Sequence, residues 1–332
     1  MRTTGRLLLT ALLLVTATAC TGGGAPDPGK QITLTLNWYP YGEHAPFYHG
    51  LKQGIFRKHG INLKIQAGQG SGKTVQAVGG GQTEFGWADT ASLLTAVDSG
   101  VPVKSLGVYL QTTPASVQFF GDKGFSKPSD LKGRTVALTA GDALSKTFGA
   151  FLKQNGMTET DVRIQNIDPA GKIAAVIADR ADSLVGNAND QGPTIQDKAK
   201  KPVSYLRFAD FGLNYYSDGL LTSTALLDKD PDLAKRMVAA TTEAWAEAEK
   251  NPAAAVESMQ GAAEQLPPPA VVLDQFTTTR ALLRTKSTRD LAPGVNTEAD
   301  WKATIEVFVR TGVLAAAKDP STYWAHTVAG KG

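Results

Sequence analysis

The segment Asn37-Trp38-Tyr39-Pro40-Tyr41-Gly42-Glu43-His44-Ala45-Pro46-Phe47-Tyr48 decides the fold and the function that this sequence predicts. An alternating apolar run at residues 32–36 leads into it, and this period of two predicts a β-strand. Pro40 and Gly42 end the strand, and residues 43–53 are typical of a helix with Pro46 in its first turn. Because ligands bind at the carboxyl ends of strands in open α/β sheets, these rings and amides predict a site for a flat, polar heterocycle. The alternative is a buried aromatic cluster at a strand–helix corner.

Strands and helices alternate along the rest of the chain, which predicts an α/β fold with parallel sheets. The predicted strands are residues 32–36, 62–66, 85–87, 103–110, 116–120, 135–138, 161–166, 183–185, 203–207 and 219–222. The predicted helices are residues 43–53, 73–79, 90–99, 142–154, 170–178, 190–198 and 232–250, and the chain is expected to be helical from there to residue 313. A chain of 332 residues exceeds the usual single hydrophobic core, so we expect two lobes.

The N-terminus has the features of a secretion signal. Two arginines precede a short apolar run, and small residues lead up to Cys20, the only cysteine in the chain. This ending resembles a bacterial lipobox, although Ala17 stands where that pattern prefers Leu. We therefore expect residues 1–20 to be a lipoprotein signal peptide with Cys20 lipidated, and residues 21–30 to be a flexible tether. An ordinary signal with a chance cysteine is the alternative, because the apolar run is shorter than the ~20 residues of a membrane span.

Composition argues against several kinds of partner and cofactor. The net charge of +3 falls to about +1 once the two leader arginines are removed, which does not predict a nucleic-acid groove. One cysteine allows neither an internal disulfide nor a thiolate metal cluster. The four histidines, His44, His49, His59 and His326, are not spaced to place two on one helix face. We expect no metal, no cofactor and no nucleic acid.

The glycine-rich segment 67–74 suggests a phosphate-binding loop but does not match one, because Ala67 stands where the Walker pattern needs glycine. A turn of this kind between a strand and a helix still presents N–H groups to an anion or a carbonyl. The candidate contacts are Gly70, Ser71, Gly72, Lys73 and Thr74. The alternative is a tight turn without a ligand.

Other polar residues stand where predicted strands end. Asp89 begins a predicted helix, where it suits an N-cap, and Thr90 follows it. Asn187 and Asp190 follow the strand at 183–185. They either read the donor and acceptor edge of an aminopyrimidine or cap the next helix.

Two adjacent tyrosines, Tyr215 and Tyr216, precede a predicted crossing between the lobes at residues 219–222. A ring stacked on a bound base contributes about 1–3 kcal/mol, and one of these tyrosines facing Trp38 would enclose a flat ligand. The alternative is a packed turn.

The patterns Asn-Trp-x-Pro and His-x-Pro-x-Tyr, at residues 37–40 and 44–48, resemble the opening of ABC-importer substrate-binding proteins in the thiamine-precursor, sulfonate and nitrate family. The likeness is greatest to the pyrimidine-binding branch, which shares its fold with thiamine-pyrimidine synthase. It continues through residues 52–56, 60–63, 84–89 and 130–134 and fades after about residue 224. Tyr41 and Gly42 replace a more polar pair in that branch, so sulfonate, nitrate and flavin ligands stay open beside the pyrimidine.

The resemblance implies a two-lobed, type II periplasmic-binding-protein-like fold, with a mainly parallel sheet in each lobe and a hinge of two crossings. Lobe one would comprise residues 31–118 and 222–332, and lobe two residues 119–221. Ligand would be clamped between the lobes. The implied contacts are stacking by Trp38 and by Tyr215 or Tyr216, hydrogen bonds from Asn37 and Asp190 to the ring edge, and further contacts from Tyr39 and His44.

The function implied is that of an extracytoplasmic, monomeric lipoprotein without catalytic activity, which delivers a small aromatic nutrient to ABC permease and ATPase subunits. The ligand implied is a thiamine pyrimidine precursor of the hydroxymethyl or formylamino type. The rival from another class is the related synthase, an enzyme that consumes its own histidine and carries a cysteine-rich iron motif. Ser92 stands about where that histidine would lie, and no cysteine cluster is present. Polar strand ends disfavour a third interpretation, an adhesion lipoprotein.

Overall fold

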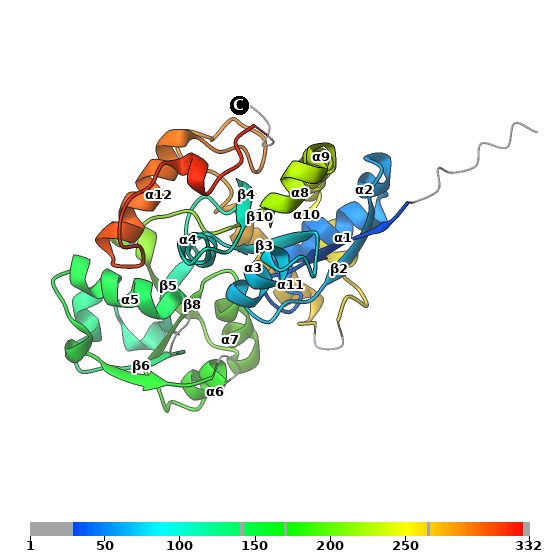
Figure 1. The fold of residues 1–332 in the computed structure, drawn as a ribbon. Coiled ribbons are helices and arrows are strands. Elements are labelled where there is room, and N and C mark those ends of the chain that lie inside the picture. Colours follow the sequence, from blue (N-terminus) through cyan, green and yellow to red (C-terminus); the bar gives the residue numbers. More distant parts are fainter. Residues whose placement is uncertain (1–28, 140–142, 169–170, 264–265, 328–332) are drawn as a thin grey trace, which may run out of the picture.

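The structure is a computed structural model that describes residues 29–139, 143–168, 171–263 and 266–327. Two five-stranded sheets, each flanked by helices, form a two-lobed α/β molecule (Figure 1). The predicted signal peptide with Cys20, and the predicted tether up to residue 28, lie outside the described residues. Within the described ranges, none of the helices combines the length and the apolar character that crossing a membrane requires.

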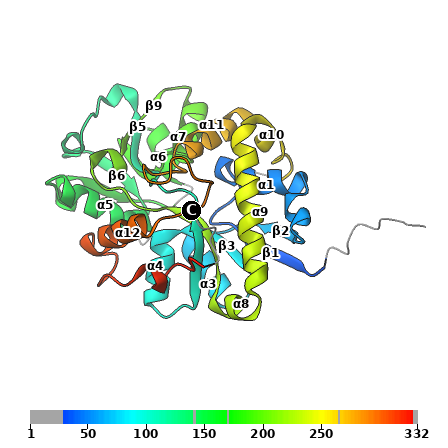
Figure 2. The ribbon, with the colours of Figure 1, turned by 90° about the horizontal axis from the view of Figure 1, so that it is seen from above.

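The first sheet has the strand order β2-β1-β3-β10-β4. Its strands are β1 (Gln31–Thr35), β2 (Asn62–Gln66), β3 (Phe85–Asp89), β4 (Val103–Val108) and β10 (Asp218–Ser223). A short 3-10 turn, η1 (Gly42–His44), and the helices α1 (Ala45–Lys52), α2 (Ile55–Lys58), α3 (Ser71–Gly79) and α4 (Thr90–Asp98) connect them. The chain returns to this half with α8 (Thr224–Lys229), the long α9 (Pro231–Lys250), α10 (Pro252–Glu257) and α11 (Pro269–Arg280). Helix α9 packs against α1 (Figure 2).

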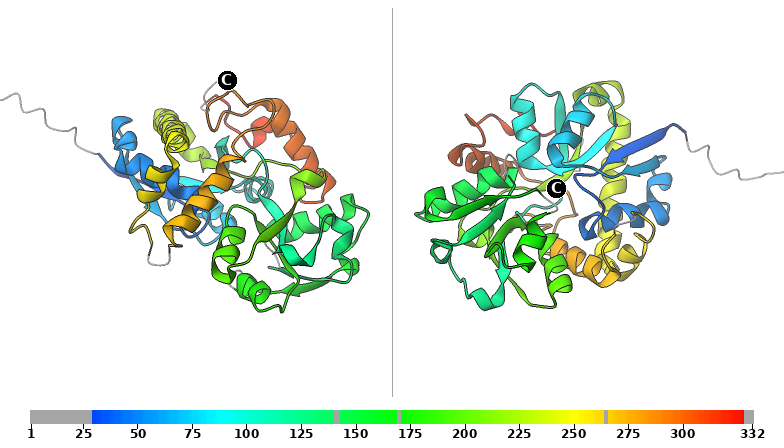
Figure 3. Two further views of the ribbon diagram at one scale, coloured as in Figure 1. Left: turned by 180° about the vertical axis from the view of Figure 1, so that it is seen from behind. Right: turned by 90° about the horizontal axis from the view of Figure 1, so that it is seen from below.

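The second sheet has the strand order β7-β6-β8-β5-β9. Its strands are β5 (Ala115–Phe120), β6 (Thr135–Leu138), β7 (Arg163–Asn166), β8 (Ser183–Asn187) and β9 (Val203–Arg207). Helices α5 (Ala143–Gln154), α6 (Gly171–Ile177) and α7 (Gln191–Ala199) belong to this half, and α12 (Glu298–Arg310) lies beside α5 (Figures 1 and 3). Helix α11 contacts both η1 and α7, so it joins the two halves of the molecule.

The prediction of a mainly parallel sheet in each lobe is confirmed, and one strand in each sheet runs antiparallel to the others. Strand β10 pairs antiparallel with β3 and β4, and β5 pairs antiparallel with β8 and β9. These are the strands by which the chain enters the second sheet and returns to the first. A strand reached directly from the other sheet has no crossover helix before it, so the βαβ rule does not set its direction. The remaining strands of each sheet run parallel, and the lobe boundaries stay a prediction.

An aromatic cluster forms the core beneath the first sheet. Trp87 of β3 stacks on Trp245 of α9 with ring centroids 5.3 Å apart, and Phe47 of α1 meets Trp87 edge-on at 5.0 Å. All three side chains are fully buried. Such ring pairs stabilise by about 0.5–1.5 kcal/mol beyond their buried area. The cluster therefore fixes α1, and with it the opening motif, against the sheet.

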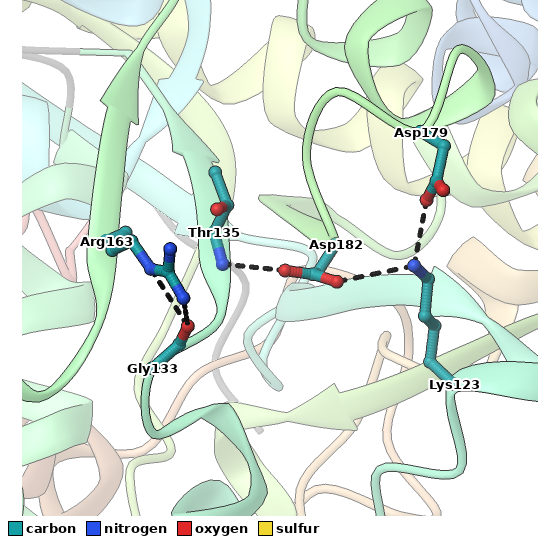
Figure 4. A network of polar contacts seen from close by, with 6 residues as sticks. All are labelled: Lys123, Gly133, Thr135, Arg163, Asp179 and Asp182. Atoms are coloured by element: carbon teal, nitrogen blue, oxygen red, sulfur yellow. Dashed lines mark hydrogen bonds and ion pairs between the residues drawn. The ribbon is translucent and has the colours of Figure 1, made fainter.

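Polar contacts at the amino ends of β6, β7 and β8 hold the second sheet together on the side away from its carboxyl ends (Figure 4). Asp182 accepts hydrogen bonds from Thr135 N at 2.8 Å and from Lys123 Nζ at 3.3 Å. Lys123 also pairs with Asp179 at 2.8 Å, and Arg163 donates twice to the Gly133 carbonyl oxygen. This network leaves the opposite, carboxyl ends of the strands free to form a site.

Predicted strands occur near their expected positions, and those at 62–66, 135–138 and 203–207 have the predicted bounds. Several helices were predicted between Pro231 and residue 313, and α9, α10, α11 and α12 occur there. Residues 258–263 and 266–268 lie outside α10 and α11, and residues 281–297 separate α11 from α12. Three consecutive prolines end at Pro269, which begins α11, where a helix needs no N–H from its first residue.

Candidate ligand-binding site

A cleft of about 950 Å³ lies between the two sheets, where the parallel strands of both end. Among the described residues, four rings line it: Trp38, Tyr39, Tyr41 and Tyr215. The charged side chains of the described residues that line it are Lys73, Asp89, Lys172, Asp190 and Asp218. They come from both halves of the molecule, as a two-lobed ligand clamp requires.

The aromatic wall follows directly from the end of β1. Tyr39 is 56% exposed, which is unusual for a large ring, and Trp38 meets it edge-on with centroids 5.5 Å apart. Tyr41 is buried and packs edge-on against His44 at 4.6 Å. Exposed rings beside a cleft offer apolar area that a flat ligand would cover.

Asn37 and His44 are buried, and both hydrogen-bond to protein groups. The Asn37 amide nitrogen donates to Asp218 Oδ1 at 2.8 Å, and its oxygen lies 2.8 Å from His44 Nε2. Burial lowers the pKa of His44 to about 3, so its imidazole is neutral. Burial raises the pKa of Asp218 well above its ordinary value, and the carboxylates of Glu43 and Asp89 raise it further.

Glu43 is a fully buried carboxylate behind the cleft wall. It accepts hydrogen bonds from Tyr41 Oη at 2.6 Å, Trp87 Nε1 at 2.7 Å and Asn189 Nδ2 at 2.9 Å. Asn189 belongs to the loop after β8, so this carboxylate joins the two halves of the molecule. Burial raises the pKa of Glu43, and the three donors oppose that effect.

The glycine-rich turn packs closely on the end of β1. A Cβ atom at Gly68 would lie 1.8 Å from the Leu36 carbonyl oxygen, so only glycine fits there. Gly70 has φ +113° and precedes the first turn of α3. The turn places Gly70, Ser71, Gly72 and Lys73 on the cleft, where the first N–H groups of α3 lack intrahelical acceptors. Thr74 is buried and donates to the Leu36 carbonyl oxygen at 2.7 Å.

Asp89 caps α4, as one of its two interpretations predicted. Its carboxylate accepts from Ser92 N at 2.7 Å and from Ser92 Oγ at 2.9 Å, while the residue also lines the cleft. Thr90 is buried, and its hydroxyl donates to the Ser217 carbonyl oxygen at 2.6 Å. The Asp89 carboxylate therefore lines the cleft while it accepts two hydrogen bonds from Ser92.

The opposite wall comes from the second sheet. Asn187 ends β8, and Asp190 precedes α7; both line the cleft. Burial raises the pKa of Asp190 to about 7, Glu43 adds to the effect, and Lys172 opposes it. Lys172 is itself buried in the first turns of α6, with its ammonium 2.9 Å from the Val185 carbonyl oxygen.

The structure separates the two adjacent tyrosines. Tyr215 lines the cleft, with its ring 4.9 Å from that of Phe308 in α12. Burial raises the pKa of its hydroxyl to about 12, so it stays protonated at neutral pH. Tyr216 instead meets Trp301 edge-on at 5.5 Å and is not a lining residue. Tyr215 is therefore the tyrosine placed to contact a ligand.

The cleft unites most of the residues that the sequence predicted as ligand contacts. Those that line it are Asn37, Trp38, Tyr39, Gly70, Ser71, Gly72, Lys73, Asp89, Asn187, Asp190 and Tyr215. His44, Thr74, Thr90 and Tyr216 lie behind it and bond or pack against protein groups. A contact role for these four side chains does not fit, because their packing turns them toward the interior.

Sequence reasoning missed Tyr41, Lys172 and Asp218 as lining residues. Asp218 ends the segment 214–218 that contains the two tyrosines, so its place beside a lobe crossing was a usable signal. Lys172 stands in a helix that follows a strand end, and this position alone is a weaker signal for a cleft residue. Among the described residues, no group of three or more His, Cys, Asp or Glu side chains is placed to hold a metal ion.

The model of the family described as NMT1/THI5 like matches residues 42–255, more than half of the chain. This protein belongs to the NMT1/THI5-like family. The predicted family resemblance is therefore confirmed.

Curated relatives of this NMT1/THI5-like chain carry different functional names. It is 26% identical over 258 residues to riboflavin-binding protein RibY of Chloroflexus aurantiacus, covering 74% of this chain and 72% of that one. It is 24% identical over 275 residues to 4-amino-5-hydroxymethyl-2-methylpyrimidine phosphate synthase of Legionella pneumophila, covering 82% of this chain and 84% of that one.

Among solved structures, the NMT1/THI5-like chain is similar to the periplasmic aliphatic sulphonate binding protein SsuA of Escherichia coli. The TM-score is 0.69 at 16% identity, covering 89% of this chain and 91% of that one. This likeness confirms the predicted periplasmic-binding-protein-like fold.

Proposed function

We propose that this protein is the extracytoplasmic binding lipoprotein of an ABC importer and that it captures a flat nitrogen heterocycle bearing hydrogen-bond donors. One observation carries the proposal. Two rings after the end of β1, exposed Tyr39 and half-buried Trp38, share a cleft with three carboxylates, Asp89, Asp190 and Asp218, which come from both halves of the molecule. Rings hold a flat ligand, and carboxylates accept hydrogen bonds from its amino, imino or hydroxyl groups. Contacts from both sides favour the closed state of a two-lobed protein.

The charge distribution favours this ligand class over sulfonate or nitrate. Asp190 and Asp218 both lie close enough to buried Glu43 for its charge to raise their pKa. An anion in that part of the cleft would add a further negative charge where like charges already repel. Lys73 and the start of α3 also line the cleft, where Ser71 contacts Asp89, and they suit a polar tail or a carbonyl.

A thiamine pyrimidine precursor of the hydroxymethyl or formylamino type meets these requirements, because it joins a flat ring to an exocyclic amine and a polar substituent. Trp38 and Tyr215 would contact the ring faces, and Asp190 and Asp218 the donors. The second candidate is a flavin. Two observations favour it: the cleft volume of about 950 Å³ lies near the upper end of the usual range of about 300–1,000 Å³, and a relative is named as riboflavin-binding.

We propose that the chain binds its ligand without catalysis. Ser92 lines the cleft and stands about where the related synthase would carry its histidine. We further propose that lipidated Cys20 anchors a monomer to the outer face of the cell membrane, with permease and ATPase subunits as partners.

Calorimetric titration with a panel of ligands tests the proposal. The panel comprises 4-amino-5-hydroxymethyl-2-methylpyrimidine, its formylamino counterpart, thiamine, riboflavin, taurine and nitrate. We expect micromolar or tighter binding of a pyrimidine or of riboflavin, and none of taurine or nitrate. Binding of taurine or nitrate alone, or of no member, would overturn the proposal. Mass spectrometry of membrane-extracted protein tests lipidation at Cys20.

A further inference from the structure

We propose that Asp218 is the carboxylate that selects the ligand's N–H or O–H donors, and that Asn37 and His44 are positioning residues that hold it in place. This inference rests on the proposed function and adds to it the group that recognises the ligand. It also changes the role expected of Asn37, from a ligand contact to a support for one.

Asp218 combines burial with unused hydrogen-bonding capacity. It is 1% exposed, yet it lines the cleft at the start of β10, beside the return crossing between the sheets. Its Oδ1 accepts from Asn37 Nδ2 at 2.8 Å, and its Oδ2 accepts from Ser217 Oγ at 2.9 Å. Because each carboxylate oxygen accepts about two hydrogen bonds, capacity for a donor from the cleft remains.

The orientation of the neighbouring groups follows from donor and acceptor chemistry. A carboxylate accepts, so the Asn37 amide must turn its NH₂ toward Asp218 and its oxygen toward His44, as observed. His44 Nε2 must then carry the hydrogen. Its Nδ1 is left as an acceptor, and the Tyr41 backbone N–H lies 3.4 Å from it. The side chains of His44 and Asn37 are 0% and 7% exposed, so the chain of contacts is sheltered from water.

This arrangement leaves Asp218 in need of a donor. Burial raises its pKa, and the carboxylates of Glu43 and Asp89 raise it further. A ligand N–H or O–H would stabilise the ionised form, and a ligand without that donor would leave the carboxylate facing the cleft unpaired. Unpaired buried polar groups discriminate between ligands more strongly than lost apolar contact does.

Donor-deleted analogues test the role of Asp218. Each probe is paired with one analogue: the aminopyrimidine with the compound lacking its exocyclic amine, and riboflavin with N3-methylriboflavin. We expect wild-type protein to bind whichever probe it accepts about 10–100-fold more tightly than the analogue. Asp218→Asn should bring that ratio close to one. Asp228→Asn, an exposed carboxylate on α8, is the matched control and should leave the ratio unchanged.

Variants of His44 test the positioning role. His44→Gln retains a donor for Asn37 and should keep most of the ratio, whereas His44→Phe should lower it by several-fold while the affinity for the analogue stays the same. If Asp218→Asn or His44→Phe weakened the binding of probe and analogue equally, the substituted residue would have a merely structural role. That result would overturn the inference.

A measurement without ligand separates this inference from the proposed function. Nitrogen-15 spectra, assigned with His44→Gln, should show the neutral Nε2–H tautomer of His44. The Nδ1–H tautomer, or a charged ring at neutral pH, would overturn the positioning role whether or not any probe binds. If wild-type protein binds no probe, the proposed function and the ligand role of Asp218 both fail. The tautomer of His44 would still show whether His44 donates to Asn37.

Discussion

Replacing Glu43 with Gln is expected to destabilise the folded protein by about 1–3 kcal/mol. The carboxylate is fully buried, and three donors surround it: Tyr41 Oη at 2.6 Å, Trp87 Nε1 at 2.7 Å and Asn189 Nδ2 at 2.9 Å. The first lies within the opening motif, the second holds that motif to β3, and the third holds the first half of the molecule to the second.

The magnitude follows from counting acceptors. Glutamine has the same shape but offers one acceptor oxygen and an NH₂ group. If the NH₂ faces Trp87, the indole N–H loses its acceptor; if it faces Tyr41 and Asn189, the tyrosine hydroxyl can accept but the asparagine NH₂ cannot. One buried donor is unsatisfied in either case, which costs about 1–3 kcal/mol.

The effect should depend on pH in a direction that can be worked out. Burial raises the pKa of Glu43 above 4.5, so the native state binds this proton more tightly than the unfolded state does. Stability from this group is therefore full below pH about 4.5 and falls as pH rises through the native pKa. Glutamine lacks that dependence, so its destabilisation relative to wild type should be larger at pH 4 than at pH 7.

Urea unfolding followed by tryptophan fluorescence measures both effects, with an unchanged slope expected for an unchanged fold. Glu298→Gln is the matched control, because Glu298 forms an exposed pair with Lys302 and should change stability by less than about 0.5 kcal/mol. The reasoning would be refuted if the Glu43→Gln variant had the same free energy of unfolding as wild type. It would also be refuted if the destabilisation were larger at pH 7 than at pH 4.

Three further predictions concern the cleft. Trp38→Ala should weaken binding of the cognate heterocycle by about 1–3 kcal/mol in calorimetry. Trp38→Phe should keep most of the affinity. If Trp38→Ala bound the ligand as tightly as wild type does, stacking by Trp38 would be excluded. The pKa of Asp190, raised to about 7 by burial and by Glu43, predicts that affinity for a donor-bearing ligand rises with pH to about 7 and then levels, and that Asp190→Asn removes this slope. Gly68→Ala should lower the urea midpoint sharply because its Cβ would lie 1.8 Å from a backbone carbonyl oxygen, while Gly72→Ala, with open space around it, should not.

The sequence predicted the positions of strands well because short apolar runs and the turns between them are local signals. It did not predict the directions of β5 and β10, which depend on how the chain passes between the sheets. The sequence predicted several helices after Pro231 but not the long break at residues 281–297, since apolar content alone does not mark it.

The candidate site was predictable where a polar or aromatic residue directly follows a strand, as at Trp38, Asp89 and Asn187. It was not predictable where the decisive partner is distant in sequence. Asn37 and Asp218 are 181 residues apart, and their hydrogen bond settles which way the amide points. Only the folded chain shows that the amide turns inward.

The opening motif therefore divides into two sets of residues with different roles. Asn37, Glu43 and His44 point into the protein, where they hold Asp218, Asn189 and the core indole of β3. Trp38 and Tyr39 face the cleft. In the proposed function, the inward set frames the cleft, whereas the carboxylates on β10 and after β8 would meet the ligand's edge.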